Sequence, residues 1–368
     1  MSERTRYLGL DVCKGTIQVA VAETDGTVAE YVSIANDPTA VRRLVQRLGR
    51  GARLVSACEA GPTGYPLHRQ LVQLGAQNAV IAPSLMPRRP GGRVKTDRRD
   101  TIQLARLLRS GDLTPVWVPD QAKESLRDLA RARDDARVDG LRARHQLGKF
   151  LSRQGISAPP AVGRSWSAKH QAWLNTLAFQ EVAAQVAFDD YLASVRAAGE
   201  RVRRLEAALV ECAAEGRHRD LLRALQALRG VGFLTAVAIV AEVGDLRRFQ
   251  RAAEFMAYAG LVPTEHSSGA TRRWGLIAKT GNRLLRQVLV EAAHHARLQP
   301  AVSSALRQRQ AGLSAEVVDI SWRCQLRLHL KYLHLGGRLG RQKAVTATAR
   351  ELAGFVWSVG QIMGAPSA

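Results

Sequence analysis

The chain has 368 residues, which is enough for two or more domains with hydrophobic cores of their own. It carries 54 Lys and Arg against 32 Asp and Glu, and the resulting formal net charge of +22 attracts phosphate backbones. The lack of a run of about 20 apolar residues excludes a membrane-spanning helix, and the N-terminus has no apolar signal-peptide core. The four cysteines form no CxxC pair, which argues against a zinc knuckle or a disulfide framework and fits a reducing cytosol.

The first third of the chain predicts a domain that mixes strands and helices. We expect YLGLDV and TIQVAVA to form a hairpin, with VAEYVSI as a third strand. Helices and further strands are then expected to alternate, at 38–48 (helix), 54–60 (strand), 66–74 (helix), 78–83 (strand) and 97–108 (helix). Three hairpin-like strands followed by alternating helices and strands is the order of an RNase H-like domain.

The middle of the chain predicts two long helices. Apolar residues recur on a highly charged background from residue 121 to about 155, and again over 175–215, with a loop at 157–167 between them. Such helices are expected to form an antiparallel hairpin or coiled coil. The sequence therefore predicts an α/β domain at 1–118, a helical coiled-coil region at 119–220 and a mainly helical domain at 221–368.

The segment LRGVGFLTAVAIVAEVGD, residues 228–245, opens the last region. Its Gly-x-Gly turn between apolar helices resembles a helix-hairpin-helix element, in which glycines let the backbone approach a phosphate. A turn that only packs two helices together explains the pattern equally well. The rest of the chain is predicted to be helical with basic loops.

Four acids stand where their side chains can meet. Asp11 ends the first expected strand and Glu59 ends a later one, and these two strands are neighbours in an RNase H-like sheet. Asp97 and Asp100 open a helix, and an i, i+3 pair projects from one helix face. Four converging carboxylates repel one another unless they hold cations. The set therefore predicts a site for two divalent ions, Mg²⁺ or Mn²⁺, as used in phosphodiester chemistry.

Each acid also has an ordinary structural explanation. Asp11 could be a turn residue, Asp97 could be an N-cap, and Asp97 with Asp100 could belong to a salt-bridged surface helix. The joint pattern is much less expected by chance and favours the metal site. Nearby cations would bring a phosphate backbone to that site and partly offset its negative charge. These cations are Arg88, Arg89, Arg93, Lys95, Arg98 and Arg99.

The segment LVPTEHSSGATRRWG places Ser267 and Ser268 in a loop that leads into a basic stretch. A serine hydroxyl is a weak nucleophile that needs a base, a metal or a positive field. Arg272, Arg273 and Lys279 could supply that field, and with Arg283 they are expected to contact nucleic acid. From these residues alone, a flexible loop that only contacts phosphate is the better-supported interpretation.

The chain resembles the DEDD transposases of bacterial insertion sequences, whose better-studied members are bridge-RNA-guided serine recombinases. The resemblance rests on YLGLDVCKGTIQVAVAE, CEAGPTGYPLHRQL, VKTDRRDTIQLARLL and the long stretch from GVGFLTAVAIVAEVGD to RLLRQVLVEAA. It runs through nearly the whole chain in the usual order and is weaker in the two long helices and toward the C-terminus.

The resemblance implies a RuvC-like N-terminal domain, a coiled-coil segment and a C-terminal transposase domain. It implies that Asp11, Glu59, Asp97 and Asp100 are the metal ligands. It also implies that the serine before glycine, Ser268, is the nucleophile that forms a covalent phosphoserine link to DNA, with the adjacent Ser267 as the alternative.

The resemblance further implies the partners. These are donor and target DNA, a non-coding bridge RNA that reads their sequences, and other copies of the chain in a dimer or tetramer that joins acids and serine from different subunits. The protein is expected in the bacterial cytoplasm, associated with the nucleoid and not with a membrane. Two other functions stay open: a RuvC-like nuclease that cuts branched DNA without a covalent step, and a non-catalytic nucleic-acid-binding protein with a decayed site.

Overall fold

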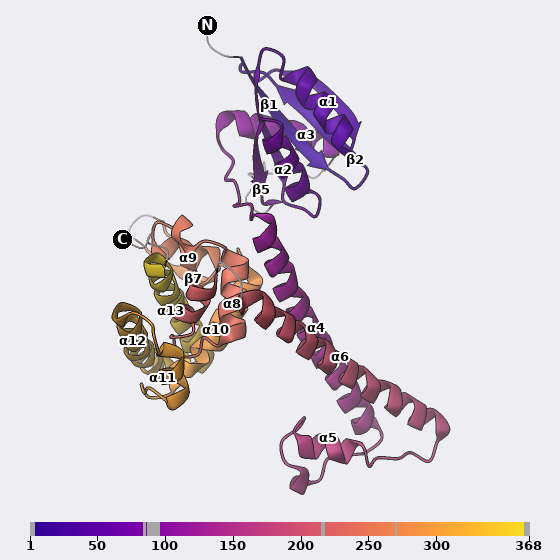
Figure 1. Ribbon diagram of the computed structural model, residues 1–368, viewed down its shortest axis with the longest axis vertical. Coiled ribbons are helices and arrows are strands. Elements are labelled where there is room, and N and C mark those ends of the chain that lie inside the picture. The colour runs from indigo at the N-terminus through magenta and orange to yellow at the C-terminus, as the bar shows by residue number, and fades with distance from the viewer. Residues whose placement is uncertain (1–3, 84–85, 87–95, 215–217, 269–270, 364–368) are drawn as a thin grey trace. The chain divides into compact units, whose positions relative to one another are not determined.

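The computed structural model describes residues 4–83, 86, 96–214, 218–268 and 271–363. Four of the predicted cations, Arg88, Arg89, Arg93 and Lys95, lie outside the described residues. The chain divides into two compact units, Met1–Pro119 and Asp120–Ala368, shown in Figure 1. None of the helices in the described ranges combines the length and apolar character that a membrane crossing requires.

The first unit is built on a five-stranded sheet with the order β3-β2-β1-β4-β5. β2 is antiparallel to β1 and β3, whereas β4 is parallel to β1 and β5. The strands are β1 (Thr5–Val12), β2 (Thr16–Ala22), β3 (Val28–Ala35), β4 (Arg53–Glu59) and β5 (Gln77–Ile81). The expected hairpin of three strands followed by alternating helices and strands is confirmed.

Helices cover both faces of this sheet (Figure 1). On one face, α1 (Pro38–Leu48) and α2 (Gly64–Gln73) pack against the apolar residues of β1, β2 and β4. On the other face, α3 (Asp97–Ser110) packs Ala105 against Ala20 and Ala22 of β2. The alternation of side chains along each strand supplies both faces with buried residues.

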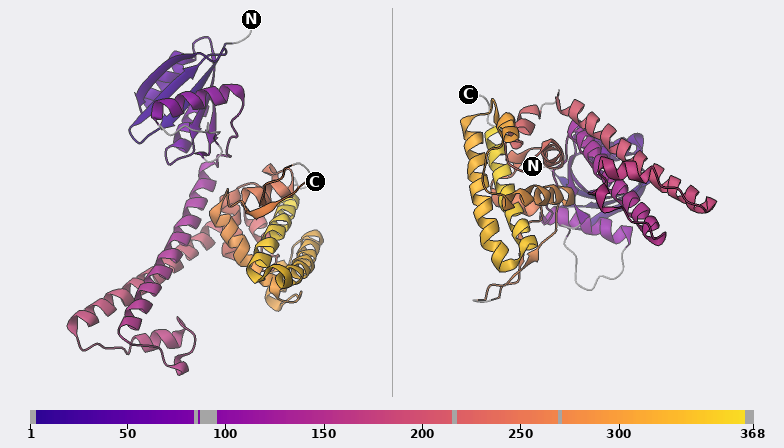
Figure 2. Two further views of the ribbon diagram at one scale, coloured as in Figure 1. Left: turned by 180° about the vertical axis from the view of Figure 1, so that it is seen from behind. Right: turned by 90° about the horizontal axis from the view of Figure 1, so that it is seen from below.

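The second unit begins with a long helical hairpin. α4 (Gln121–Arg153) and α6 (Val182–Ala214) run side by side, as Figure 1 and both views of Figure 2 show. At their far end the short helix α5 (Ala168–Leu174) and the residues around it form a lobe with its own hydrophobic cluster. The second long helix therefore starts later than predicted, because the residues from 175 to 181 belong to this lobe.

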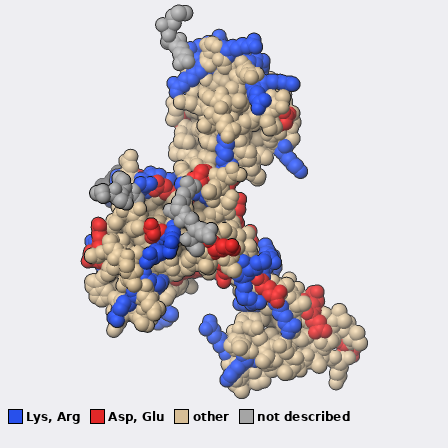
Figure 3. Space-filling view, in the orientation of Figure 1, with Lys and Arg blue, Asp and Glu red and all other residues tan. Residues whose placement is uncertain are grey.

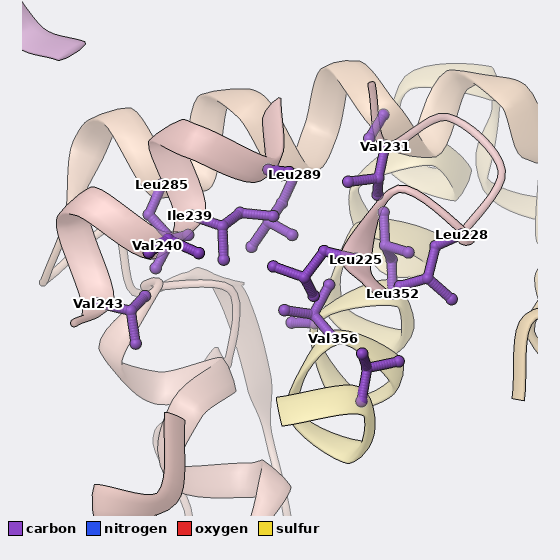
Figure 4. Packing of buried hydrophobic residues seen from close by; sticks show 14 of the residues in the cluster. Leu225, Leu228, Val231, Ile239, Val240, Val243, Leu285, Leu289, Leu352 and Val356 are labelled. Carbon is purple, nitrogen blue, oxygen red and sulfur yellow. The ribbon is translucent and has the colours of Figure 1, made fainter. Parts of the chain in front are cut away.

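The rest of the second unit is mainly helical. Its elements are α7 (Arg219–Leu225), α8 (Phe233–Val243), α9 (Ala252–Tyr258), β6 (Pro263–Glu265), β7 (Trp274–Ile277), α10 (Arg283–Ala293), α11 (Ser304–Gln310), α12 (Ala315–Leu339) and α13 (Arg341–Met363). The core of this part is formed by apolar side chains of α7, α8, α10 and α13 that point toward one another (Figure 4). The long helices α12 and α13 lie side by side (Figure 2).

The Gly-x-Gly turn lies between α7 and α8, and its first glycine is needed for packing. Gly230 has a φ of +90°, and a Cβ added there would lie 2.4 Å from the carbonyl oxygen of Ala292 in α10. The close approach that this glycine allows is therefore made to a neighbouring helix. This supports the packing interpretation of the turn at Gly230.

Candidate active site

Asp11 and Glu59 lie at matching positions on the neighbouring parallel strands β1 and β4. Leu10 of β1 pairs with Cys58 of β4, so the next residue on each strand is one of the two acids. Leu10 and Cys58 are buried toward α1 and α2. Because side chains alternate along a strand, Asp11 and Glu59 project from the opposite face, which α3 covers. Both acids are half-buried there.

The backbone of α3 lies directly against β1 on this face. A Cβ added to Gly9 would lie 2.2 Å from the carbonyl oxygen of Thr101 and 2.7 Å from the amide nitrogen of Ala105. No side chain fits at this crossing, so a glycine is required two residues before Asp11. The glycine brings the first half of α3 as close to the strand as the two backbones allow.

The direction of α3 places its two acids at the same end of the sheet. At its C-terminal end, Arg109 donates a hydrogen bond of 3.1 Å to the carbonyl of Thr24, in the turn between β2 and β3. That turn lies beside the start of β1, since β1 and β2 are antiparallel. The N-terminal turn of α3, with Asp97 and Asp100, therefore lies toward the end of β1 that carries Asp11. Asp97 is exposed and Asp100 is half-buried.

The N-cap alternative for Asp97 is wrong. The N-cap of α3 is Thr96, whose side chain accepts a hydrogen bond from the amide of Arg99. Asp97 is the first helical residue, where a carboxylate is favoured by the helix dipole but is not needed to cap the helix. The turn-residue explanation of Asp11 fails as well, because Asp11 lies within β1 and pairs with Gln18.

The four carboxylates suit a hard divalent cation by their chemistry. Among the described residues, however, no group of three or more His, Cys, Asp or Glu side chains is close enough to hold a metal ion. The acids would have to draw together for three of them to share an ion. The structure brings them to one corner of the first unit, which we call the acid corner (Asp11, Glu59, Asp97 and Asp100), without closing them around a point.

Polar residues extend the acid corner across the sheet. Gln18 of β2 lies beside Asp11, and its amide donates to Ser33 of β3 while it accepts from the hydroxyl of Tyr31. The predicted cation Arg98 lies 5.2 Å above the ring of Tyr31. Sequence reasoning did not find Gln18 or Tyr31, although Gln18 interrupts an otherwise apolar strand.

The serine loop of the second unit belongs to the hairpin of β6 and β7, which we call the serine hairpin (residues 263–277). Its residues 265–268 and 271–276 are exposed. Ser267 donates a hydrogen bond of 2.7 Å to Glu265. Ser268 exchanges two backbone hydrogen bonds of 3.1 Å with Thr271, and among the described residues its hydroxyl has no hydrogen-bond partner. The two adjacent serines therefore differ, since only the hydroxyl of Ser267 is tied to a carboxylate.

Glu265 also holds one of the predicted cations. The guanidinium of Arg272 donates to Glu265 at 2.8 Å and lies 4.4 Å above the ring of Trp274. The hydrogen bonds from Arg272 and Ser267 hold the pKa of Glu265 below its usual value, so this carboxylate is charged at neutral pH. Arg273 and Lys279 are exposed on the same segment, and Arg283 begins α10.

Comparison with known proteins places this arrangement in a family. A family described as "Transposase IS116/IS110/IS902 family" matches residues 222–307, and a DEDD family of IS110 type described as "Transposase" matches residues 8–155. The "Putative transposase y4qE" of Sinorhizobium fredii is 41% identical over 97% of this chain and 88% of its own length. The chain belongs to the IS110/IS116 family of transposases. The "Transposase for insertion sequence element IS1533" of Leptospira borgpetersenii is a further relative, 33% identical over 90% of this chain and 97% of its own length.

The acid corner and the serine hairpin of this transposase fall in different matched ranges. The first range contains all four residues of the acid corner, and the second contains the serine hairpin. The family therefore implies DNA strand cleavage and transfer, and a DEDD domain suggests dependence on a divalent metal.

A buried carboxylate that sequence reasoning missed supports the base of the serine hairpin in the transposase. Glu242 of α8 is fully buried and accepts two hydrogen bonds from Arg131 of α4, at 2.7 and 2.9 Å. Its other partner is the side chain of Asn282, and Arg127 lies 3.9 Å from it. The signal in the sequence is a single acid in the apolar run AVAIVAEV.

Asn282 connects this buried network to the loop that follows β7. Its side chain caps α10 by accepting a hydrogen bond from the backbone amide of Leu285. The backbone amide of Asn282 donates to the backbone carbonyl of Tyr258. A Cβ on Gly281 would lie 2.3 Å from that same carbonyl oxygen, so the two backbones touch. Lys279, in this loop, adopts a φ of +56°, a conformation that non-glycine residues rarely adopt. The serine hairpin thus has exposed residues at Ser267, Ser268 and Thr271 and is firmly held at its base.

Proposed function

We propose that this transposase cleaves and rejoins DNA by attack of Ser268 on a DNA phosphate, at a site whose divalent ions are held by Asp11, Glu59, Asp97 and Asp100. The observation that carries the proposal is the placement of four acids from three separate elements at one end of one sheet face. An ordinary surface helix would not need its first turn to lie toward the end of the sheet at which two strands each carry a carboxylate.

The strand order supports an RNase H-like, RuvC-like assignment for the first unit. Three antiparallel strands lead the sheet, β4 and β5 are added parallel to β1, and an acid lies near the end of the first strand. In parallel sheets covered by helices, sites form at the carboxyl ends of the strands. The acid corner lies at that end.

The chemistry exchanges one phosphodiester for another. The oxygen of Ser268 forms a bond to phosphorus while the bond from phosphorus to a sugar oxygen breaks. The serine proton leaves, and the released sugar hydroxyl gains a proton. A second attack, by a DNA hydroxyl on the phosphoserine, reverses these steps and rejoins a strand without an external energy source. When bound, divalent ions would supply positive charge to the oxygens that carry negative charge in the transition state.

Ser268 is the better nucleophile of the adjacent pair. The hydroxyl of Ser267 donates to the charged Glu265, and its attack on phosphorus would have to break this hydrogen bond beside a negative charge that repels the phosphate. The backbone of Ser268 is fixed by its pairing with Thr271, while its exposed side chain remains able to reach a DNA strand.

Partners beyond DNA belong to the same proposal. A net charge of +22 suits binding to a structured bridge RNA as well as to DNA, with base pairing reading the sequence. Self-association into a dimer or tetramer would let the acids of one subunit meet the serine of another. An exposed apolar stripe on α12 offers a contact for a second copy and consists of Trp322, Leu326, Leu330 and Leu333.

The decisive experiment compares two neighbouring serines. A plasmid that carries the ends of the element is incubated with the transposase and its RNA, and protein-linked DNA is separated on a denaturing gel. We expect Ser268→Ala to remove both the adduct and strand exchange, and the matched Ser267→Ala variant to retain both. Mass spectrometry of the wild-type adduct should place the phosphate on Ser268.

Three other results would each reject this mechanism. Recombination by Ser268→Ala would show that another group is the nucleophile. If Ser268→Ala and the wild type both cut branched DNA with equal metal dependence and without an adduct, the chain is instead a RuvC-like nuclease. If Asp11→Asn changes neither DNA cleavage nor exchange, the chain is a non-catalytic binding protein.

A further inference from the structure

The tip of the helical hairpin is more elaborate than a turn between two helices requires. Antiparallel helices are commonly joined by a few residues, whereas this chain places α5 and its flanking loops between Arg153 and Val182. The lobe has a separate hydrophobic cluster that includes Phe150, Leu174 and Phe188. Its residues after 155 lie between the two ranges that match the transposase families, whereas the end of α4 belongs to the first range. A lobe with a core of its own is suited to present a binding site.

An open hollow of about 540 Å³ lies on this lobe, between the end of α4 and the start of α5. None of the described residues that line it is acidic. The lining groups with polar or aromatic character are Arg144, His145, Lys149, Ser152, Ser165, Trp166 and His170. Figure 3 shows Lys and Arg along the side of the lobe where α5 lies in Figure 1, with Asp and Glu on the opposite side. The hollow is therefore suited to an anion.

Trp166 is held in an unusual conformation at the edge of the hollow. Its φ of 64° lies in the left-handed region, which is costly for a bulky residue and is kept only where the surroundings impose it. The guanidinium of Arg144 lies 5.2 Å above its ring, and the ring of His170 lies 5.3 Å from it. The indole is half-exposed, so part of it can still receive a flat ligand.

His170 brings a buried polar atom without a partner to the hollow. The residue is 7% exposed, and among the described residues its Nδ1 forms no hydrogen bond. It lies between Trp166 and Trp173, each 5.3 Å from it between ring centres. Burial lowers the pKa of His170, which favours the neutral ring. An unsatisfied buried polar atom is costly, and a ligand with a hydrogen-bonding edge would satisfy it.

We propose that this hollow binds an unpaired nucleotide of a single-stranded nucleic acid. Its base stacks on Trp166 and presents a hydrogen-bonding edge to His170, while the phosphates on either side contact Arg144 and Lys149. Aromatic faces beside a cationic groove are the general means by which proteins hold single strands. The site is independent of the strand chemistry proposed above, because it lies in a different part of the chain and holds no acid.

The test measures binding by the full-length protein and varies the salt concentration. Arg144→Ala with Lys149→Ala is compared with a control, Arg142→Ala with Arg201→Ala, which also removes two cations from the hairpin but from residues paired to Asp139. With single-stranded probes, we expect the first pair to lower the slope of log affinity against log salt by about 1.4, since each phosphate contact on a single strand contributes about 0.7. The control pair should lower it by much less. Identical sequences as RNA and as DNA then show which strand the site prefers.

Substitutions of Trp166 separate stacking from packing. Trp166→Leu keeps an apolar side chain but has no aromatic face, and we expect it to weaken binding roughly tenfold, whereas Trp166→Phe should retain most of the affinity. Ultraviolet cross-linking of the wild-type protein to the same probes should link the peptide that contains Trp166 and His170. Thermal unfolding of each variant checks that the lobe remains folded.

Three outcomes would overturn the proposal. One is equal loss of slope in the test and control pairs, which would indicate non-specific attraction to the charge of the hairpin. Another is the absence of any cross-link within residues 153–182 while cross-links form elsewhere. The third is an unchanged affinity of both Trp166 variants for RNA and DNA probes, which would leave a protein partner as the occupant of the hollow.

Discussion

The acid corner and the serine hairpin are positioned in opposite ways. Asp11 and Glu59 are placed by the register of two paired strands, and α3 is placed against them by the clearance at Gly9. The serine hairpin is a pair of short strands on which Ser267 and Ser268 are exposed, and it is held at its base through Asn282 and the buried Glu242. Strand register and backbone clearance thus set where the acids lie, whereas buried side-chain contacts support the base of the serine hairpin.

The largest expected effect comes from removing one acid of the corner. Asp11→Asn keeps the size of the side chain but removes a ligand charge, and we expect DNA strand cleavage to fall by about 10³-fold, as when a group that stabilises transition-state charge is lost. The thermal unfolding temperature should not fall, because the remaining carboxylates repel one another less. Asp25→Asn, at the far end of the same sheet, is the control and should cleave normally. Full activity of Asp11→Asn would show that the corner is structural.

Glu242→Ala removes the buried carboxylate that supports the base of the serine hairpin. This carboxylate lies 3.9 Å from Arg127 and 2.7 Å from Arg131, and we expect the second unit to lose about 3 kcal/mol of unfolding free energy without it. Hydrogen exchange over 274–282 should speed up more than exchange in α12. The control is Glu254→Ala, which removes an exposed ion pair with Arg251 and a hydrogen bond from the backbone amide of Gln250, and should cost about 1 kcal/mol. Equal losses in the two variants would contradict the special role of Glu242.

Gly9→Ala tests the close approach of α3 to β1 that positions the acid corner. The added Cβ would meet the carbonyl oxygen of Thr101 at 2.2 Å, so α3 must shift away from β1. We expect a loss of about 2 kcal/mol in stability, typical of overpacking, together with loss of cleavage. Gly15→Ala, where no atom lies within 4 Å of the added Cβ, should be nearly neutral in both measurements. A stable Gly9→Ala variant with full activity would refute the required close approach.

The smallest expected effect is the pH dependence of the contacts that Glu265 makes in the serine hairpin. Because the folded-state pKa of Glu265 is lowered, its ties to Arg272 and Ser267 are fully present above its usual pKa of about 4.3 and are lost as the pH falls through the lowered value. The Nε–H signal of Arg272 in an NMR titration should therefore stay constant from neutral pH to about pH 5 and change only below that. Glu265→Gln should abolish this change. A change in this signal between neutral pH and about pH 5 would contradict the assignment to Glu265.

Much of the first unit could be predicted from the sequence. The alternation in TIQVAVA and the apolar run LVSACEA gave strands, and the acids at their ends pointed to one sheet edge. The separation of these acids could not be predicted, because it depends on how closely α3 approaches the sheet. That approach is set by Gly9, a residue that hairpin and strand patterns do not distinguish from any other strand glycine.

Less of the second unit could be predicted from the sequence. The lobe around α5 was expected to be a loop running into a long helix, because its aromatic residues are spread over loops without helical spacing. The structural role of Glu242 could not be predicted, because its partners Arg131 and Asn282 lie far from it in the sequence. The metal-ligand role of the acid corner and the nucleophilic role of Ser268 stay predictions.

The most direct test of the account asks whether the four acids share one metal site. Fe²⁺ is added to the transposase with ascorbate and peroxide, and the hydroxyl radicals formed at the bound ion cut the nearby backbone. Mass spectrometry should find cuts beside Asp11, Glu59 and the Asp97–Asp100 turn in the same sample, and Asp11→Asn should remove all of them together. Cuts at only one of these segments, or cuts that persist unchanged in Asp11→Asn, would contradict a shared site.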